Sequence, residues 1–283
     1  MASSLVDVTC EDGSVKPLTI LTQMHSSQDE IKANIAGNMK RWGHLPRFMQ
    51  LPGLLHARNK PIALIGGGAS LNSQIDRING FDHVMTCGSA HDHLIDMGIV
   101  PNFALAVDAK EDAADYFQKP QDLTSYLLAS QCHPNLYERL EGKKIAIWHF
   151  LGQCDDKDVF QGEPQINWGC MVGVLAVQMA LYLGFQELHF FGFDCSYVED
   201  EHHAYDVGHY HHQVKEKQSV FSTNCKAFHS TMALVSQIEH LYDVFASTDG
   251  SYIKGYVYGD GMWANNIKAS PPDMRRWLEA VDV

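Results

Sequence analysis

The stretch that decides the fold reads Pro61-Ile-Ala-Leu-Ile65 and runs directly into Gly66-Gly-Gly-Ala-Ser-Leu71. The first five residues are apolar and have the length of a strand, which is typical of a parallel strand buried on both faces. Three consecutive glycines then let the backbone turn sharply and approach another group closely. The next residues begin a predicted helix, whose free N–H groups favour an anion. The stretch therefore predicts a strand–turn–helix unit that contacts a phosphate or nucleotide, although a purely structural turn would use the same glycines.

Two common phosphate-binding motifs are incomplete at this turn. No Gly-Lys-Ser/Thr follows, so it is not a Walker loop, and Leu71 replaces the third glycine of the dinucleotide fingerprint. Ser70 can cap the helix or offer a hydroxyl to a phosphate. Gly66, Gly67, Gly68 and Ser70 are therefore candidate nucleotide-binding residues outside the standard motifs.

Outward from this unit, short apolar runs alternate with helical segments. Strands are expected at residues 84–87, 103–107, 125–128, 144–148, 188–193 and 244–247, and helices at 90–97, 134–140, 170–183 and 225–241. Such alternation predicts an α/β fold with a mostly parallel sheet and helices on both faces. The expected divisions are an N-terminal arm (with a strand at 17–22) and helical segment over 1–58, a catalytic domain over 59–255, and a C-terminal tail over 256–283 with a short helix.

Composition narrows the class of protein. The 283 residues are 45% hydrophobic and 19% charged, which suffices for a packed core. A net charge of −13 argues against a general nucleic-acid binder, but leaves room for a local anion groove in the basic stretch 41–60. No apolar run reaches membrane-spanning length, and the start does not read as a signal peptide. Seven scattered cysteines without a CxxC pair indicate reduced thiols, so we expect a cytoplasmic protein.

The ends of the predicted strands carry the remaining candidates, because ligands of such sheets bind beyond the carboxyl ends of the strands. Cys87-Gly-Ser-Ala90 is a second strand-to-helix turn of small residues. Asp108 and Asp194 each end a strand. A carboxylate such as Asp108 can bind a ribose hydroxyl, a base amine or a metal, or can simply cap a helix. Asn167 and the backbone of Gly169 lead into the apolar helix and can donate to a nucleotide, and Asn167 can equally cap that helix.

Histidines gather in the polar segment 199–224, which we interpret as a functional loop or lid. They stand at positions 202, 203, 209, 211 and 212, among carboxylates and tyrosines. Imidazoles and carboxylates at this density can bind a transition metal, but zincin spacing is missing. They can also supply a general base, because histidine titrates near neutral pH. A solvated polar loop is the third interpretation, and the metal question stays open.

The order of these blocks resembles a known family. PIALIGGGASL (61–71) and VMTCGSAHDHLIDMGIVPNFALAVDA (84–109) resemble the MptE-like group, named for archaeal 6-hydroxymethylpterin diphosphokinase. WGCMVGVLAVQMALYLGFQELHFFGFDCSY (168–197), followed by HHAYD (202–206), resembles the related flagellin-modifying proteins, and is similar to bacterial sialyltransferases of the same Rossmann-like fold. The blocks cover about half of the chain.

The resemblance implies a nucleotide site and a set of roles. The implied nucleotide-binding residues are Gly66, Gly68, Ser70, Cys87, Gly88 and Ser89, with Asn167 and Gly169 nearby and Asp108 and Asp194 at acidic strand ends. The implied lid histidine is His203, His209 or His211. One departure concerns Val107-Asp-Ala-Lys110, which carries one carboxylate where the archaeal pyrophosphokinases carry two.

These observations predict a transferase with a nucleotide-activated donor. We expect a glycosyltransferase that moves a sugar from a CMP- or UDP-sugar to a hydroxyl acceptor by single displacement, with a lid histidine as base. The acceptor can be a glycan, a protein, a small molecule or a modified nucleobase, and the chain can form a homo-oligomer. The alternatives are a Mg²⁺-dependent pyrophosphokinase acting on a pterin-like alcohol, and a non-catalytic nucleotide-binding protein.

Overall fold

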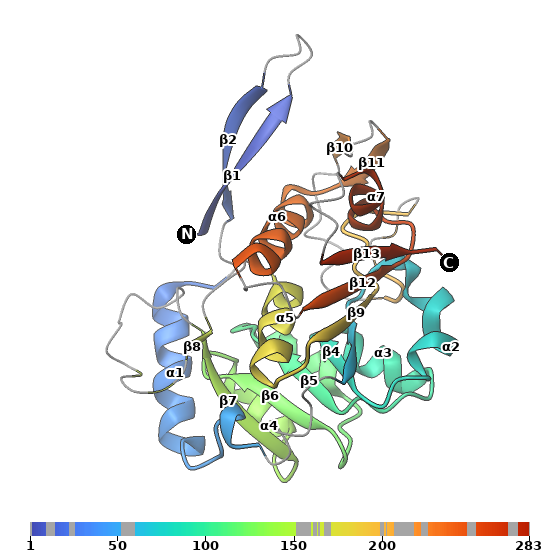
Figure 1. Cartoon of the computed structure of the whole chain (residues 1–283). Helices are drawn as coiled ribbons and strands as arrows, with labels where there is room; N and C mark the ends of the chain where they lie inside the picture. The colour runs from blue at the N-terminus through green and yellow to red at the C-terminus, as the bar shows by residue number, and fades with distance from the viewer. Residues whose placement is uncertain are drawn as a thin grey trace.

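The computed structural model describes residues 26–51, 60–150, 160, 163, 165–166, 171–198, 201, 203–206, 226–247, 253–270 and 277–282, and the backbone of strands at 2–9, 15–22 and 218–221. Its main feature is one nine-stranded sheet at the centre of the molecule (Figure 1). The strands are β3 (Pro61–Ile65), β4 (Val84–Cys87), β5 (Phe103–Ala106), β6 (Ser125–Ala129), β7 (Lys144–Phe150), β8 (Gln165–Ile166), β9 (Glu187–Phe191), β12 (Lys254–Tyr258) and β13 (Leu278–Val281).

The sheet reverses its direction of growth at β3. The strand order is β13-β12-β9-β3-β4-β5-β6-β7-β8, and every neighbouring pair is parallel. The chain builds outward from β3 to β8, returns to pair β9 with the free side of β3, and then adds β12 and β13. This confirms the predicted parallel sheet. It also places a topological switch point between the carboxyl ends of β3 and β9, where sheets of this kind bind ligands.

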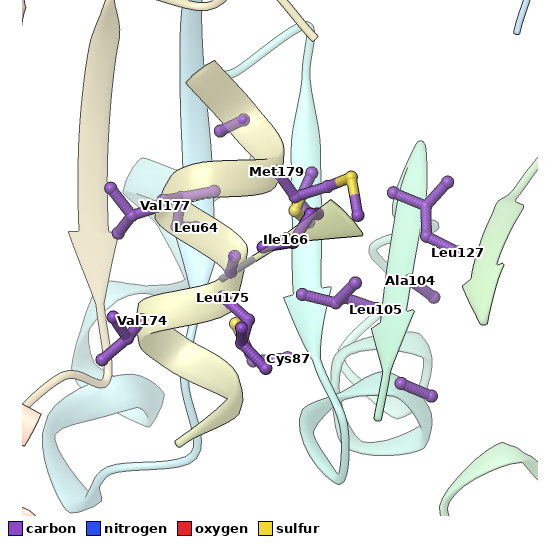
Figure 2. Close-up of a cluster of buried hydrophobic side chains, with 14 of the residues drawn as sticks. Leu64, Cys87, Ala104, Leu105, Leu127, Ile166, Val174, Leu175, Val177 and Met179 are labelled. Atoms are coloured by element: carbon purple, nitrogen blue, oxygen red, sulfur yellow. The ribbon is translucent and has the colours of Figure 1, made fainter. Parts of the chain in front are cut away.

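Helices cover both faces of the sheet, as the apolar runs predicted. In β3, Ile62 and Leu64 join the core cluster that includes residues of α5 (Val172–Tyr182), whereas Ala63 and Ile65 join a second cluster with residues of α2 (Ile75–Ile78) and α3 (Ala90–Asp96). Figure 2 shows α5 lying over the sheet, with Val174, Leu175 and Met179 beside side chains of the strands. Because α5 has no polar face, it can only form inside such a core.

The N-terminal helix α1 (Gln28–Trp42) is stabilised by a local cap at its start and by hydrogen bonds to distant loops. A capping box starts it, in which the Glu30 amide donates to Ser27 Oγ over 3.2 Å and the Ser27 amide donates to Glu30 Oε2 over 2.9 Å. Two buried asparagines then bond the helix to the loops after β5 and β6. Asn34 donates to the carbonyls of Ala109 and Gln131, and Asn38 to those of Ser130 and Cys132. The expected helical segment 28–58 thus ends at Trp42, and a short 3₁₀ helix η1 (Phe48–Gln50) follows.

The second half of the chain differs from the prediction in three places. The helix expected at 225–241 begins later, because β11 (Ala227–Ser230) occupies its start and pairs antiparallel with β10 (Gln218–Phe221). The helix continues to Ser247 as α6 (Met232–Ser247), so the strand expected at 244–247 was wrong. Its buried Ile238, Leu241, Val244 and Phe245 recur at helical spacing, so the apolar residues near 244 belong to a helix face. Residues expected to form a tail instead add β12, α7 (Met262–Ala269) and β13, and β12 begins at Lys254, before the expected boundary.

The remaining elements are peripheral to the site. β1 (Ala2–Thr9) and β2 (Val15–Thr22) form a separate antiparallel hairpin that stands away from the main sheet in Figure 1, and β2 includes the expected strand at 17–22. α4 (Pro134–Arg139) is preceded by a 3₁₀ helix η4 (Glu111–Phe117). None of the helices in the described ranges is both long and apolar enough to cross a bilayer.

Candidate functional site

The triple-glycine bend follows β3 and brings three other segments into close contact. A Cβ at Gly66 would lie 2.5 Å from the carbonyl oxygen of Gly192. A Cβ at Gly68 would overlap the carboxylate of Asp194, and one at Gly67 would lie 2.5 Å from His203 Cδ2 and 2.6 Å from the Tyr205 hydroxyl. Real Cβ atoms do not approach other atoms so closely. A side chain at any of the three positions would therefore collide with a neighbouring segment.

The amides of the bend are bonded within the protein. Gly66 N–H donates to the Phe191 carbonyl and Gly68 N–H to the Gly192 carbonyl, each over 2.8 Å. Ser70 N–H donates to Asp194 Oδ2 over 2.9 Å, at the start of the 3₁₀ helix η3 (Ala69–Gln74). The anion at the beginning of this helix is thus the protein's own carboxylate. Three of the donors that the sequence offered to a phosphate hold β9 to β3 in this structure.

Asp194 lies at the centre of the switch point and is 3% exposed. Burial raises the pKa of its carboxyl group, the backbone N–H and the hydroxyl of Ser70 lower that pKa, and the charge of Asp260 raises it. Neither Asp194 Oδ1 nor Ser70 Oγ makes a hydrogen bond of good geometry within the described residues. A buried carboxylate costs free energy unless its oxygens are satisfied. Apart from the contact between the Ser70 hydroxyl and the Asp194 carboxylate, Asp194 Oδ1 and Ser70 Oγ therefore have hydrogen-bonding capacity left at the switch point.

The backbone around Asp194 is unusual. Cys195 adopts φ 53°, a left-handed conformation that is rare for a residue other than glycine. The turn is held from outside, because Ser230 Oγ donates to the Cys195 carbonyl over 2.8 Å and the Met262 amide donates to Ser196 Oγ over 3.1 Å. Strain of this kind persists only where the surroundings impose it, and it gathers at functional sites.

A third loop at the switch point was missed by the sequence reasoning. Gly259-Asp-Gly261 follows β12, and a Cβ at Gly259 would lie 2.7 Å from Ser70 Oγ and 3.2 Å from Asp194 Oδ1. Gly261 packs on the backbone of Asp194 in the same way. The sequence does show a glycine on either side of Asp260. This pattern predicts a loop at the ligand edge only if residues 254–258 are recognised as a strand of the sheet.

The second predicted turn also lies at this edge. Gly88 has φ 51° and donates its N–H to the Leu105 carbonyl over 2.9 Å, and a Cβ on it would meet Val172 at the start of α5 at 3.9 Å. Ser89 Oγ and the Tyr205 hydroxyl are 2.8 Å apart. Cys87 is fully buried, and burial raises the pKa of its thiol to about 12, so this thiol is a packing residue in the structure.

Of the other predicted residues that the structure describes, Asp108 lies away from the bend and His203 lies at it. Asp108 follows β5, which β4 separates from β3, and its backbone carbonyl accepts from the His133 amide over 3.4 Å. Of the three candidate histidines, His203 lies against Gly67. His209, His211, Asn167 and Gly169 lie outside the described residues. The structure therefore brings together the glycine bend, Ser70, the 87–89 turn, Asp194 and His203.

The basic stretch 41–60 is largely neutralised where it is described. Arg41 pairs with Glu138, and Arg47 pairs with Glu163 through two nitrogens. The hydrogen bonds from Arg47 lower the pKa of Glu163 to about 2, with a further contribution from buried His149, whose Nε2 lies 2.7 Å from the carboxylate. Arg41 thus connects α1 to α4, and Arg47 connects the loop before η1 to the segment between β7 and β8. These two arginines are engaged in ion pairs, whereas His56 and Arg58 lie outside the described residues.

The described residues fit a magnesium ion poorly. Mg²⁺ prefers several carboxylate oxygens and phosphates around one position. No group of three metal-binding side chains occurs within the described ranges. At the switch point the carboxylates are Asp194 and the exposed Asp260, whose Oδ1 lies 4.0 Å from Lys268 Nζ.

Comparisons with known proteins give a family and a fold. A family model described as 6-hydroxymethylpterin diphosphokinase MptE-like matches residues 33–200. The structure of MAf glycosyltransferase from Magnetospirillum magneticum AMB-1 is similar at a TM-score of 0.67 and 15% identity, over 93% of this chain and 39% of that chain. The chain thus spans well under half the length of that enzyme, and the likeness is one of fold.

A mammalian sialyltransferase in complex with Gal-beta-1-3GalNAc-ortho-nitrophenol gives a TM-score of 0.36 at 15% identity, over 65% of this chain and 78% of the other. That similarity is too low to carry an argument. No curated protein sequence matches the chain.

Proposed function

The chain belongs to the 6-hydroxymethylpterin diphosphokinase MptE-like family, and from this premise we propose that it is a transferase whose donor is a nucleotide-activated compound. The family name itself describes a transferase, since a diphosphokinase transfers a pyrophosphoryl group. The observation that carries the proposal is the cluster at the switch point, where buried Asp194 accepts a hydrogen bond from the Ser70 amide and His203 lies against Gly67.

We infer that the transferred group is a sugar from a CMP- or UDP-sugar. The fold likeness to a glycosyltransferase supports this choice. Glycosyl transfer by single displacement needs a base at the acceptor and hydrogen-bond donors at the leaving phosphate, and requires no cluster of carboxylates around a metal.

In the proposed reaction the acceptor hydroxyl loses its proton to His203 while its oxygen bonds to the anomeric carbon. The bond between that carbon and the phosphate oxygen breaks, and the nucleotide leaves with the bonding electrons. The hydroxyl of Ser70 is the candidate donor to the leaving phosphate, since the hydroxyl of Ser89 meets that of Tyr205. Asp194 holds the Ser70 amide and so fixes the bend on which both donor and base depend. The acceptor class, whether glycan, protein, small molecule or modified nucleobase, stays open.

Pyrophosphoryl transfer to a pterin-like alcohol is the second candidate, favoured by the family description. It needs Mg²⁺ to neutralise the triphosphate. Asp194 and Asp260 are the described carboxylates that would face such an ion, with Asp108 and Asp206 at other positions of the same sheet edge. Because the described donor set is poor for Mg²⁺, no step is assigned through it.

A thermal-shift screen with CMP, UDP and ATP, each with Mg²⁺ and with EDTA, separates the candidates, because a ligand that binds only the folded state raises its melting temperature. We expect CMP or UDP to stabilise the protein in EDTA, and release of that nucleotide from its sugar conjugate on turnover. Stabilisation by ATP only with Mg²⁺ would support the kinase, and stabilisation without any turnover would indicate a nucleotide-binding protein. Ser70→Ala should reduce the shift, whereas Ser247→Ala, at the exposed end of α6, should leave it unchanged.

A further inference from the structure

Residues 203–205 bridge the two glycine turns of the site. The Ala204 amide donates to the Gly67 carbonyl over 2.9 Å, and the Ala204 carbonyl accepts from Asn72 Nδ2 over 2.8 Å. One residue later, the Tyr205 hydroxyl lies 2.8 Å from Ser89 Oγ. The segment is thereby bonded to the bend after β3, to η3 and to the turn after β4.

A stacked pair of rings completes this contact. The ring of Tyr205 stacks on His93 of α3, with centroids 4.5 Å apart and planes inclined by 25°. His93 Nε2 in turn lies 2.7 Å from Asn72 Oδ1, so the side chain of Asn72 joins the ring beneath Tyr205 to the backbone at Ala204. Burial lowers the pKa of His93 and raises that of the Tyr205 phenol, so both rings are neutral at pH 7.

We call Asn72, Ser89 and His93, which contact residues 204 and 205, the platform. These contacts join residues that are far apart in the sequence. Asn72 and Ala204 are 132 residues apart, and Ser89 and Tyr205 are 116 apart. Two side-chain hydrogen bonds, one backbone hydrogen bond and one ring stack fix three consecutive residues. The cost in conformational entropy of ordering them is met before any ligand binds. Such preorganisation is what a reaction centre requires of a group that must stand within bonding distance of its target.

We propose that Asn72, Ser89 and His93 are positioning residues that dock Tyr205 and thereby hold His203 over the triple-glycine bend. This inference rests on the proposed function, because it assigns the purpose of the platform to the proton-accepting role of His203. It also selects one histidine: His203 is two residues from the docked ring and is fixed at the bend. Gly67 is part of the same device, since any side chain there would displace both His203 and Tyr205.

The test combines amide hydrogen exchange with turnover of CMP- and UDP-sugars, measured as release of CMP or UDP. Tyr205→Phe removes only the hydroxyl that meets Ser89, and Asn72→Ala removes the bond to the Ala204 carbonyl. We expect each change to speed exchange of the Ala204 amide and to lower kcat about three- to tenfold, the scale of one lost hydrogen bond. The affinity for CMP or UDP should change less than twofold, because the platform acts on the base and not on the nucleotide.

A double variant and a matched control make the result specific. Tyr205→Phe combined with Ser89→Ala should lose no more activity than either change alone, because both remove the same hydrogen bond. Tyr182→Phe removes a hydroxyl from an exposed tyrosine of α5 and should change neither quantity.

Two outcomes would overturn the inference. In one, the Ala204 amide of the unaltered protein exchanges as fast as an unstructured amide. In the other, its exchange speeds up in Tyr205→Phe while kcat stays at the value of the Tyr182→Phe control. If the unaltered protein neither binds nor turns over any of the nucleotides, the proposed function fails instead, and the exchange data still report whether the platform docks residues 203–205.

Discussion

Asp194 is the residue on which the switch point depends. Its carboxylate is almost wholly buried, accepts a hydrogen bond from the Ser70 amide and lies beside the loop after β12. A carboxyl group whose pKa is raised in the folded state opposes folding once the pH exceeds its ordinary value, because the unfolded chain releases the proton more readily. Carboxyl groups with a raised pKa are common at functional sites, where their chemistry outweighs the stability that they cost.

Replacement of Asp194 tests this directly. Asp194→Asn keeps the shape and an acceptor for the Ser70 amide but cannot ionise. We expect its stability relative to the unaltered protein to improve as the pH rises from 4 to 7.5. Because the hydrogen bond to the Ser70 amide loses its charge assistance, we expect transfer activity to fall about three- to tenfold. Urea unfolding at both pH values and nucleotide release measure the two effects. An equal loss of stability at both pH values, with full activity, would make Asp194 a structural residue only.

Alanine substitutions at two glycines, one packed and one exposed, test the close packing around Asp194. Gly68→Ala forces a Cβ into the Asp194 carboxylate and should cost about 1–3 kcal/mol of unfolding free energy, as other overpacked sites do. Gly37→Ala lies on the exposed side of α1 with no atom within 4 Å of the added Cβ, and should stabilise the helix by up to about 1 kcal/mol. Chemical denaturation of both variants is sufficient. Opposite signs are expected, and a neutral Gly68→Ala would refute the close contact with Asp194.

At the scale of elements, the pair Arg47–Glu163 joins the loop before η1 to the segment between β7 and β8. Hydrogen bonds from Arg47 lower the pKa of Glu163 to about 2. A lowered carboxyl pKa adds stability that is complete above the unfolded value near 4.5 and is lost as the pH falls from there to about 2. The side chain of Glu163 is 33% exposed, so solvent screening reduces the contribution.

Glu163→Gln should therefore cost about 1–2 kcal/mol at pH 7, after a discount for solvent screening, and much less at pH 3. Glu138→Gln removes the partner of Arg41 in a pair that is half exposed on both sides, and should cost under about 0.5 kcal/mol. Urea midpoints of the two variants at pH 7 and pH 3 give the comparison. If the two variants lose the same free energy of unfolding at pH 7, the Arg47–Glu163 pair contributes no more than an exposed ion pair does.

Several elements follow from local sequence and others do not. The strands at 61–65 and 84–87 and the helix over 172–182 were predictable because apolar runs of the right length report burial directly. The antiparallel β10–β11 pair was not, since β11 is short and partly exposed. The bond between the Ser70 amide and Asp194 spans 124 residues, and no local pattern predicts that a carboxylate would occupy the position foreseen for a phosphate. Asp260 was missed for the same reason, as its strand is recognisable only by its partners.

For the whole molecule, the order of the sheet makes the C-terminal residues part of the core. β12 lies between β9 and β13, and the C-terminal region buries Val257, Trp263 and Ile267. A chain ending at residue 252 would expose one side of β9 and remove these side chains. We expect it to lose its cooperative unfolding transition, measured by near-ultraviolet circular dichroism. A chain starting at residue 26 removes a hairpin outside the main sheet and should keep the transition; the reverse result would make residues 256–283 a dispensable tail.

The pairing of β3 with β9 has a consequence for biosynthesis. During translation the glycine bend leaves the ribosome long before the strand that bonds its amides, and the loop after β12 follows later still. The central strand must therefore wait with one side unpaired, and pairings between distant segments form slowly. We therefore expect the nascent protein to be exposed to aggregation until residues 187–191 and 254–261 have been synthesised, and its yield to depend on chaperones and on the speed of translation.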